Sequence, residues 1–96
     1  MEIRVQTLKF DADQKLLDYV DKKVGKIARF DDNITDVEVV LSLMEKPENK
    51  VVKLQVSVPS DKLVVEKNAK TFEEAVTEAV DAMKERLTRN KEKRYD

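Results

Sequence analysis

The sequence has no cysteine, no histidine and a single glycine, Gly25. Without cysteine there is no disulfide framework, no thiolate metal site and no cysteine nucleophile. Without histidine the chain lacks the usual zinc ligand, the usual general base and any Ser-His-Asp triad. One glycine is too few for a glycine-rich phosphate-binding loop. We therefore expect a protein that is not an enzyme and that has no catalytic residues, no metal site and no cofactor.

Long apolar runs are also missing. None approaches the roughly 20 residues that a membrane-spanning helix needs, and residues 1–5 lack the apolar stretch of a signal peptide. We expect a cytoplasmic protein with no membrane partner and no small-molecule substrate.

Charge is abundant: 41% of the 96 residues are charged and 41% are hydrophobic, whereas charged residues make up about a quarter of a typical globular domain. The hydrophobic residues recur at regular spacings, which favours a folded chain over a disordered one. We expect a single domain over residues 1–96, with a flexible tail from about residue 90, where the apolar pattern ends.

Two periodicities predict an α+β fold in the order β-α-β-β-β-α. Period-two alternation indicates strands at about residues 3–10, 37–43, 52–58 and 62–66. Helical spacing follows an N-cap at Asp11, with Gln14 as its reciprocal partner, and returns after the capping box that runs from Thr71 to Glu74. We expect the core to contain all three phenylalanines: Phe10, Phe30 and Phe72.

The connections between these elements restrict the topology. Each strand has one apolar face, so both helices should pack on that face. A right-handed crossover makes the first two strands parallel, and two hairpins add two antiparallel strands. The prediction is a four-stranded mixed sheet with two parallel helices on one face, their C-terminal ends at the same end of the domain.

The charges are segregated along the chain, although the net charge is only −1. Residues 22–29 hold four cations and no acids, and residues 84–94 hold six cations and two acids. Residues 71–83 hold four acids and no cations. The helix macrodipole alone favours cations at helix ends, by about 0.3–1 kcal/mol each. Two basic segments that converge from distant parts of the sequence also suit a polyanion, most commonly a nucleic acid.

The predicted polar sheet face carries no aromatic residue, so it does not resemble an RRM platform that stacks bases. Contacts from these cations to phosphates favour recognition of folded RNA by its shape. Tyr19 and Tyr95 could stack on bases, although a rim position for Tyr19 and disorder for Tyr95 are the simpler interpretations. The candidate RNA-binding residues are Lys22, Lys23, Lys26, Arg29, Arg86, Arg89, Lys91, Lys93 and Arg94.

Two motifs resemble those of the short ribosome hibernation factors. This is the family of the ribosome-associated translation inhibitor and hibernation-promoting factor, also called the sigma-54 modulation protein family. Residues 22–27, KKVGKI, are similar to the family's KK-apolar-x-K-L, and residues 87–93, LTRNKEK, are similar to its L-x-K-x-K-x-K ending. The order and spacing of these motifs over the whole chain carry the resemblance. The chain departs from it where Thr77 replaces a frequent Asp and Ala82 a frequent Lys.

The resemblance implies a ribosome-binding domain whose partners are the small ribosomal subunit and ribosomal RNA. Such a factor binds between the head and body of that subunit, on ground used by mRNA and tRNA. It inhibits translation in stationary phase or stress. The basic positions that match the family are Lys23, Lys26, Arg89, Lys91 and Lys93; the other four come from helix geometry. Alternatives are a generic double-stranded RNA-binding module and a protein-interaction domain that uses its sheet edge.

Overall fold

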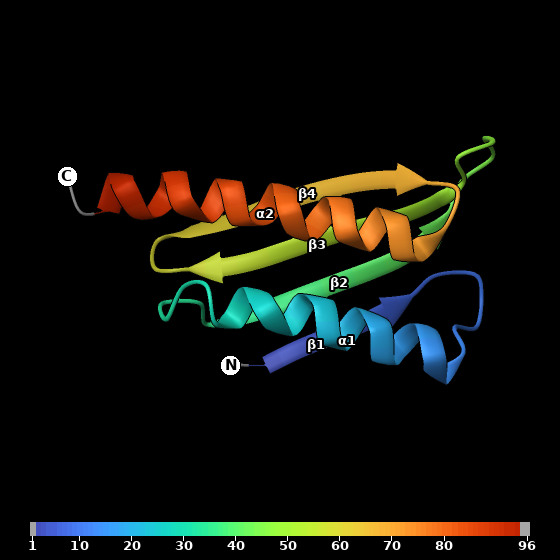
Figure 1. Cartoon of the computed structure of the whole chain (residues 1–96), viewed down its shortest axis with the longest axis horizontal. Coiled ribbons are helices and arrows are strands. Elements are labelled where there is room, and N and C mark those ends of the chain that lie inside the picture. Colours follow the sequence, from blue (N-terminus) through green and yellow to red (C-terminus); the bar gives the residue numbers. More distant parts are fainter. Residues whose placement is uncertain (1, 95–96) are drawn as a thin grey trace.

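Six elements follow one another in the predicted order (Figure 1). The structure is a computed structural model that describes residues 2–94, with side chains through residue 92. The elements are β1 (Glu2–Thr7), α1 (Gln14–Ala28), β2 (Asp36–Leu43), β3 (Lys50–Val58), β4 (Asp61–Ala69) and α2 (Phe72–Arg94).

The sheet has the strand order β1-β2-β3-β4. β1 pairs with β2 in parallel, and the other two pairings are antiparallel. Its register aligns apolar side chains across all four strands, and the row that runs through the middle of the sheet consists of Val5, Val39, Leu54 and Val65. Because successive side chains on a strand point to opposite faces, this register makes one face of the sheet apolar.

Both helices lie on that face, side by side, and run in the same direction, so the prediction of two parallel helices is confirmed (Figure 1). Val20, Val24 and Ile27 of α1 and Met83 and Leu87 of α2 are almost fully buried against the sheet. The C-terminal ends of α1 and α2 point to the same end of the molecule (Figure 1). No helix in residues 2–94 has the length and apolar character needed to cross a membrane.

The segment between β1 and α1 differs from the prediction. β1 ends at Thr7, not near Phe10, because Lys9 adopts a left-handed backbone (φ 64°) that turns the chain out of the strand. The N-cap of α1 is Asp13, not Asp11: an Asp13 carboxylate oxygen accepts a hydrogen bond from the Leu16 amide at 2.8 Å. Gln14 is not a capping partner, since its side chain donates to Asp18.

Three further details differ from the prediction or refine it. Phe30 was expected in the core but is 40% exposed, because it follows Arg29, the C-cap of α1, where the chain leaves the helix. The Thr71 cap is confirmed by a hydrogen bond from the Glu74 amide to the Thr71 hydroxyl, 3.1 Å long. The backbone of α2 is helical through Arg94; the flexible tail from about residue 90 stays a prediction. Tyr95 lies outside the described residues.

Candidate nucleic-acid interface

The cations of α1 fall on two flanks of the helix. Consecutive helical residues are rotated by about 100°, so Lys23 and Lys26 share the flank that carries Tyr19. Lys22 and Arg29, seven residues apart, share the flank that points away from the sheet. Lys22, Lys26 and Arg29 are exposed, and Lys23 is half-buried.

Tyr19 identifies the flank of α1 that faces α2. Its hydroxyl lies 3.0 Å from Thr77 Oγ1, and the Lys23 ammonium lies 5.6 Å from the centre of its ring. This distance is within the range of a cation–π interaction. Tyr19 is therefore a structural contact between the helices, which agrees with the expected rim position, and it holds Lys23 beside α2.

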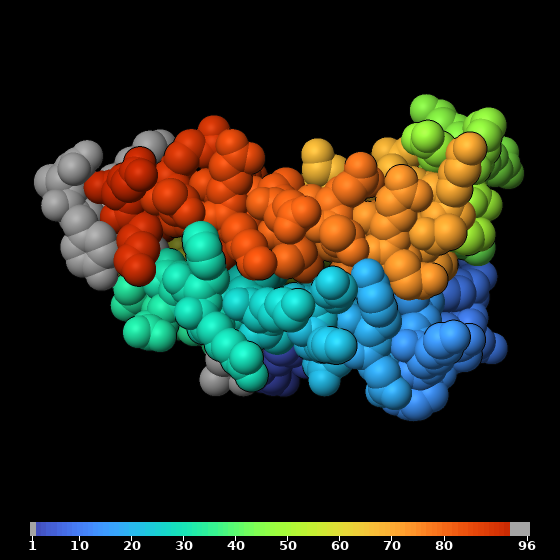
Figure 2. All heavy atoms as spheres, in the orientation of Figure 1, coloured from blue at the N-terminus to red at the C-terminus, as the bar shows by residue number. Residues whose placement is uncertain are grey.

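On α2, Thr77 marks the flank that faces α1. Lys84 and Lys91 follow it by seven and fourteen residues, and a helix drifts only about 20° per seven residues. Both lysines therefore lie on the same flank, the one that faces α1, where the two helices contact each other side by side (Figure 2). Counted from the Tyr19–Thr77 contact, Lys84 is level with Lys26 of α1, and Lys91 lies about 10 Å further along, just beyond the end of α1 at Ala28. We call the four residues Lys23, Lys26, Lys84 and Lys91 the interhelical basic surface.

Lys84 was not among the predicted site residues. It is half-buried and lies one helical turn before Thr88, whose hydroxyl donates to the Lys84 carbonyl at 3.0 Å. The number of charges in residues 84–94 does not distinguish Lys84 from the other cations of that segment. The signal that could have found it is the seven-residue spacing between Lys84 and Lys91, which places both lysines on one flank.

Arg86 and Arg89 point to the other side of α2, toward β4. Arg86 Nη1 donates a hydrogen bond of 2.7 Å to the Val64 carbonyl. Arg89 lines a hollow of about 270 Å³ together with Asp61 and Asn90, where the Asn90 amide donates to an Asp61 carboxylate oxygen at 3.3 Å. The structure thus separates these two arginines from the interhelical basic surface. The side chains of Lys93 and Arg94 lie outside the described part of the chain.

A comparison with known families matches residues 3–95 to the model described as "Sigma 54 modulation protein / S30EA ribosomal protein". The chain belongs to this family. Its fold is similar to that of a ribosomal subunit interface protein from Coxiella burnetii, with a TM-score of 0.85 and 18% identity, over 95% of this chain and 98% of the other. It is also similar to the N-terminal domain of Protein Y from Thermus thermophilus, with a TM-score of 0.79 and 27% identity, over 93% and 98%. A search of curated proteins finds no match.

In this member of the sigma-54 modulation family the charge changes sign along the face made by the two helices. Glu73 and Glu74 lie in the first turn of α2, and the lysines of the interhelical basic surface lie toward the shared C-terminal end. Cations there also complement the negative ends of two parallel macrodipoles. Two exposed acids, Glu85 and Glu92, lie on the outward ridge of α2 and interrupt the positive charge.

In the part of the chain that the structure describes, the opposite, open face of the sheet carries cations and acids side by side, as where Lys53 pairs in register with Glu66. Arg4 is held by Asp36 and Glu38, with nitrogen–oxygen distances of 3.1 and 3.3 Å. Within residues 2–94 no strand carries an aromatic side chain, so this face cannot stack bases in the manner of an RRM. The described residues also contain no group of three or more carboxylates arranged to hold a metal ion. For this family member, the interhelical basic surface is the best candidate for binding nucleic acid.

Proposed function

We propose that the protein is a ribosome hibernation factor that acts in the cytoplasm. It binds ribosomal RNA of the small ribosomal subunit near the decoding and tRNA sites, and it inhibits translation in stationary phase or stress. The observation that carries this proposal is the convergence of Lys23 and Lys26 from one helix with Lys84 and Lys91 from the other. Family membership supports it, as does the similarity to the N-terminal domain of Protein Y.

In this mechanism the protein inhibits translation by occupying a site on the ribosome, and it catalyses no reaction. Lysines on neighbouring parallel helices present several ammonium groups to the phosphates of folded RNA, which is recognised mainly by its shape. The domain measures 42 × 24 × 17 Å, so it excludes other ligands from the ground that it covers. A double-stranded RNA-binding module would place cations at a helix N-terminus, whereas α2 begins with Glu73 and Glu74. A protein-interaction domain would pair a partner strand with a sheet edge. At the β4 edge the Val64 carbonyl already accepts a hydrogen bond from Arg86.

The proposal is tested by pelleting the purified protein with ribosomes and with isolated small subunits. Wild-type protein should pellet with both. Replacing the four lysines of the interhelical basic surface with Glu should weaken binding by on the order of 100-fold or more at about 0.1 M salt, because phosphate contacts dominate such affinity. The control carries Glu74→Gln and Glu78→Gln, two exposed acids near the N-terminal end of α2, and should bind like wild type. Each variant is also melted, so that loss of binding is separated from loss of fold.

A translation extract provides the second readout. Stoichiometric protein should stop translation while the RNA stays intact and no nucleotide is consumed. If the four-lysine variant remains folded and pellets as well as wild type, the basic surface only complements the helix dipoles and the proposal is wrong. RNA cleavage during inhibition would instead contradict the mechanism of occupancy.

A further inference from the structure

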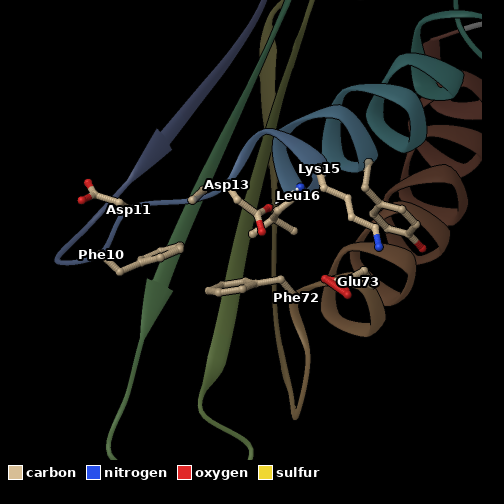
Figure 3. A pocket seen from close by; sticks show the side chains of 9 residues that line it. Phe10, Asp11, Asp13, Lys15, Leu16, Phe72 and Glu73 are labelled. Atoms are coloured by element: carbon tan, nitrogen blue, oxygen red, sulfur yellow. Dashed lines mark hydrogen bonds between the residues drawn. The ribbon is translucent and has the colours of Figure 1, made fainter.

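A second concave site lies at the opposite end of the helical face, where α1 and α2 begin (Figure 3). It is a pocket of about 440 Å³ between the loop after β1 and the first turns of both helices. Phe72 at its base and Lys91 in the interhelical basic surface are 19 residues apart on α2, which corresponds to about 28 Å along the helix axis. The pocket is therefore separate from the surface proposed to bind RNA.

The floor of the pocket is aromatic and apolar. The rings of Phe10 and Phe72 are stacked, with centroids 5.0 Å apart and an interplanar angle of 10°. Leu16 lies above this pair (Figure 3), and Tyr19, about one helical turn further along α1, also lines the pocket. Phe10, Leu16 and Tyr19 pack on the core but are only partly buried, so apolar surface stays open in the pocket. Burial of that surface would favour an apolar side chain as occupant.

The rim is mostly acidic. Asp13 and Glu73 stand beside the aromatic pair, while Asp11 lies at the outer edge with its carboxylate directed away from the rings (Figure 3). Lys15 is the one cation in the lining. All four side chains are exposed. Asp13 Oδ1 is held by the Leu16 amide, which leaves its second carboxylate oxygen for a ligand. Three carboxylates against one ammonium favour a positively charged ligand.

Two helices begin here, and a helix N-terminus ordinarily attracts anions. In this pocket the chain itself supplies the acceptors. The Asp13 carboxylate accepts a hydrogen bond from the Leu16 amide at 2.8 Å, and the Thr71 hydroxyl accepts one from the Glu74 amide at 3.1 Å. The aromatic pair shows the opposite preference, since the Lys50 ammonium, which lies outside the pocket lining, is 5.9 Å from the Phe72 ring centre. A phosphate or a nucleotide is therefore disfavoured relative to a cation.

We propose that this pocket binds a basic polypeptide segment in which one apolar side chain sits next to arginine or lysine. The apolar side chain would lie against Phe10, Leu16 and Tyr19, and the flanking cations would pair with Asp13 and Glu73. The volume of about 440 Å³ has room for one large side chain together with part of its neighbours in the segment. A few polar groups at the mouth of an apolar pocket are the usual source of specificity. In a complex with RNA, the domain would hold RNA at its basic end and a basic protein segment at its acidic end.

The test is an NMR titration of the isotope-labelled full chain with three short peptides. The first carries phenylalanine between two arginines, the second replaces the arginines with glutamates, and the third replaces the phenylalanine with alanine. The first peptide should shift the amide signals of residues 10–16 and 72–74. The glutamate peptide should leave them unchanged. The alanine peptide should bind at least about tenfold more weakly, because it lacks the ring that fills the pocket.

Variants of the charged residues at the pocket rim then show which of them contribute to peptide binding. Asp13→Asn with Glu73→Gln should weaken the first peptide about fivefold, and Asn keeps the helix cap that Asp13 provides. Lys15→Gln should tighten binding about twofold by removing the opposing cation. The matched control, Asp18→Asn with Glu78→Gln, removes the same charge outside the pocket and should have no effect.

Three results would overturn the proposal: equal weakening by the matched control, peptide-induced shifts that map away from residues 10–16 and 72–74, or stronger binding there of guanosine monophosphate than of the arginine peptide. None of these experiments involves the interhelical basic surface or the ribosome. Failure here therefore leaves the proposed RNA-binding function untouched, and failure of the ribosome assay leaves this one untouched.

Discussion

The Tyr19 hydroxyl and Thr77 Oγ1, 58 positions apart in the sequence, meet at 3.0 Å and connect α1 to α2. Thr77 also donates to the Glu73 carbonyl at 2.9 Å. Because a threonine hydroxyl has only one hydrogen, Tyr19 must be the donor in the contact between the helices. This bond lies on the flank of each helix that faces the other helix, which is also the flank on which Lys23 and Lys84 lie.

The bond should contribute measurably to stability. Tyr19→Phe should lower the free energy of unfolding by about 1 kcal/mol, and Thr77→Val by a similar amount, since a typical hydrogen bond contributes about that much. The double variant should lose less than the sum of the two, because the second change removes a bond that is already broken. Urea unfolding measures all three. Thr88→Val, which breaks only an intrahelical bond, is the control, and strictly additive losses would contradict the pairing.

Gly25 lies in the middle of α1, and a Cβ atom placed there would meet no neighbouring atom within 4 Å. Gly25→Ala should therefore raise the free energy of unfolding by about 1 kcal/mol and the melting temperature by about 4–8 °C. Gly25 lies on the flank turned away from α2, so ribosome pelleting should not change. Weaker pelleting by a more stable protein would show that the binding surface extends around α1 beyond the interhelical basic surface.

Arg86 should act on the fold more than on RNA. Its guanidinium donates to the Val64 carbonyl at the edge of β4, and Arg86→Ala removes that donor. We expect a loss of about 1 kcal/mol in the free energy of unfolding, with less effect on ribosome pelleting than Lys84→Ala. Thermal melts and pelleting of the two variants make the comparison. If Arg86→Ala pelleted less well than Lys84→Ala, RNA would have to contact the β4 side of α2.

Asp36 predicts a small dependence on pH. The Ser57 side chain, by hydrogen bonding, and then the Arg4 guanidinium lower the pKa of the Asp36 carboxyl below its ordinary value. A lowered pKa in the folded state stabilises the fold above the unfolded pKa of about 3.9, and that stabilisation is lost as the pH falls through the folded pKa. Ser57→Ala should raise the pKa of Asp36, and so should Arg4→Gln. An NMR titration of the carboxyl carbon measures both, and an unchanged titration curve in Ser57→Ala would contradict the assignment.

The arrangement of elements could be predicted because alternation and helical spacing are local properties of the chain. The right-handed crossover rule then left one sensible direction for each helix. The choice between Asp11 and Asp13 as N-cap could not be made in the same way, because both precede the helix. It depends on the left-handed backbone at Lys9, which turns the chain before Asp13.

The basic segments could be found from the sequence, but their division between two sides of α2 could not. Charge counts along a segment do not record which flank faces a neighbouring helix. That is decided by contacts between distant residues, namely Tyr19 with Thr77 on one side and Arg86 with Val64 on the other. These contacts bring Lys84 into the candidate interface and take Arg86 out of it.

The proposed phosphate contacts predict a definite response to salt. If the four lysines of the interhelical basic surface, together with Lys22 or Arg29 on the adjoining flank, meet phosphates, each contact releases condensed counterions. The logarithm of the ribosome affinity should then fall against the logarithm of salt concentration with a slope on the order of −3 to −5. Pelleting at a fixed magnesium concentration over a series of salt concentrations measures this slope.

Single neutral replacements assign that slope to positions on the surface. Lys84→Gln removes one phosphate contact in the middle of the interhelical basic surface, so it should make the slope shallower by about 1. Lys53→Gln removes the same charge from an exposed position on the open face of the sheet, so it lowers the net charge equally without touching the RNA. If the slope reports local contacts, only Lys84→Gln changes it. If both variants change it alike, the attraction comes from the charge of the whole domain and the interhelical basic surface is not the site of contact.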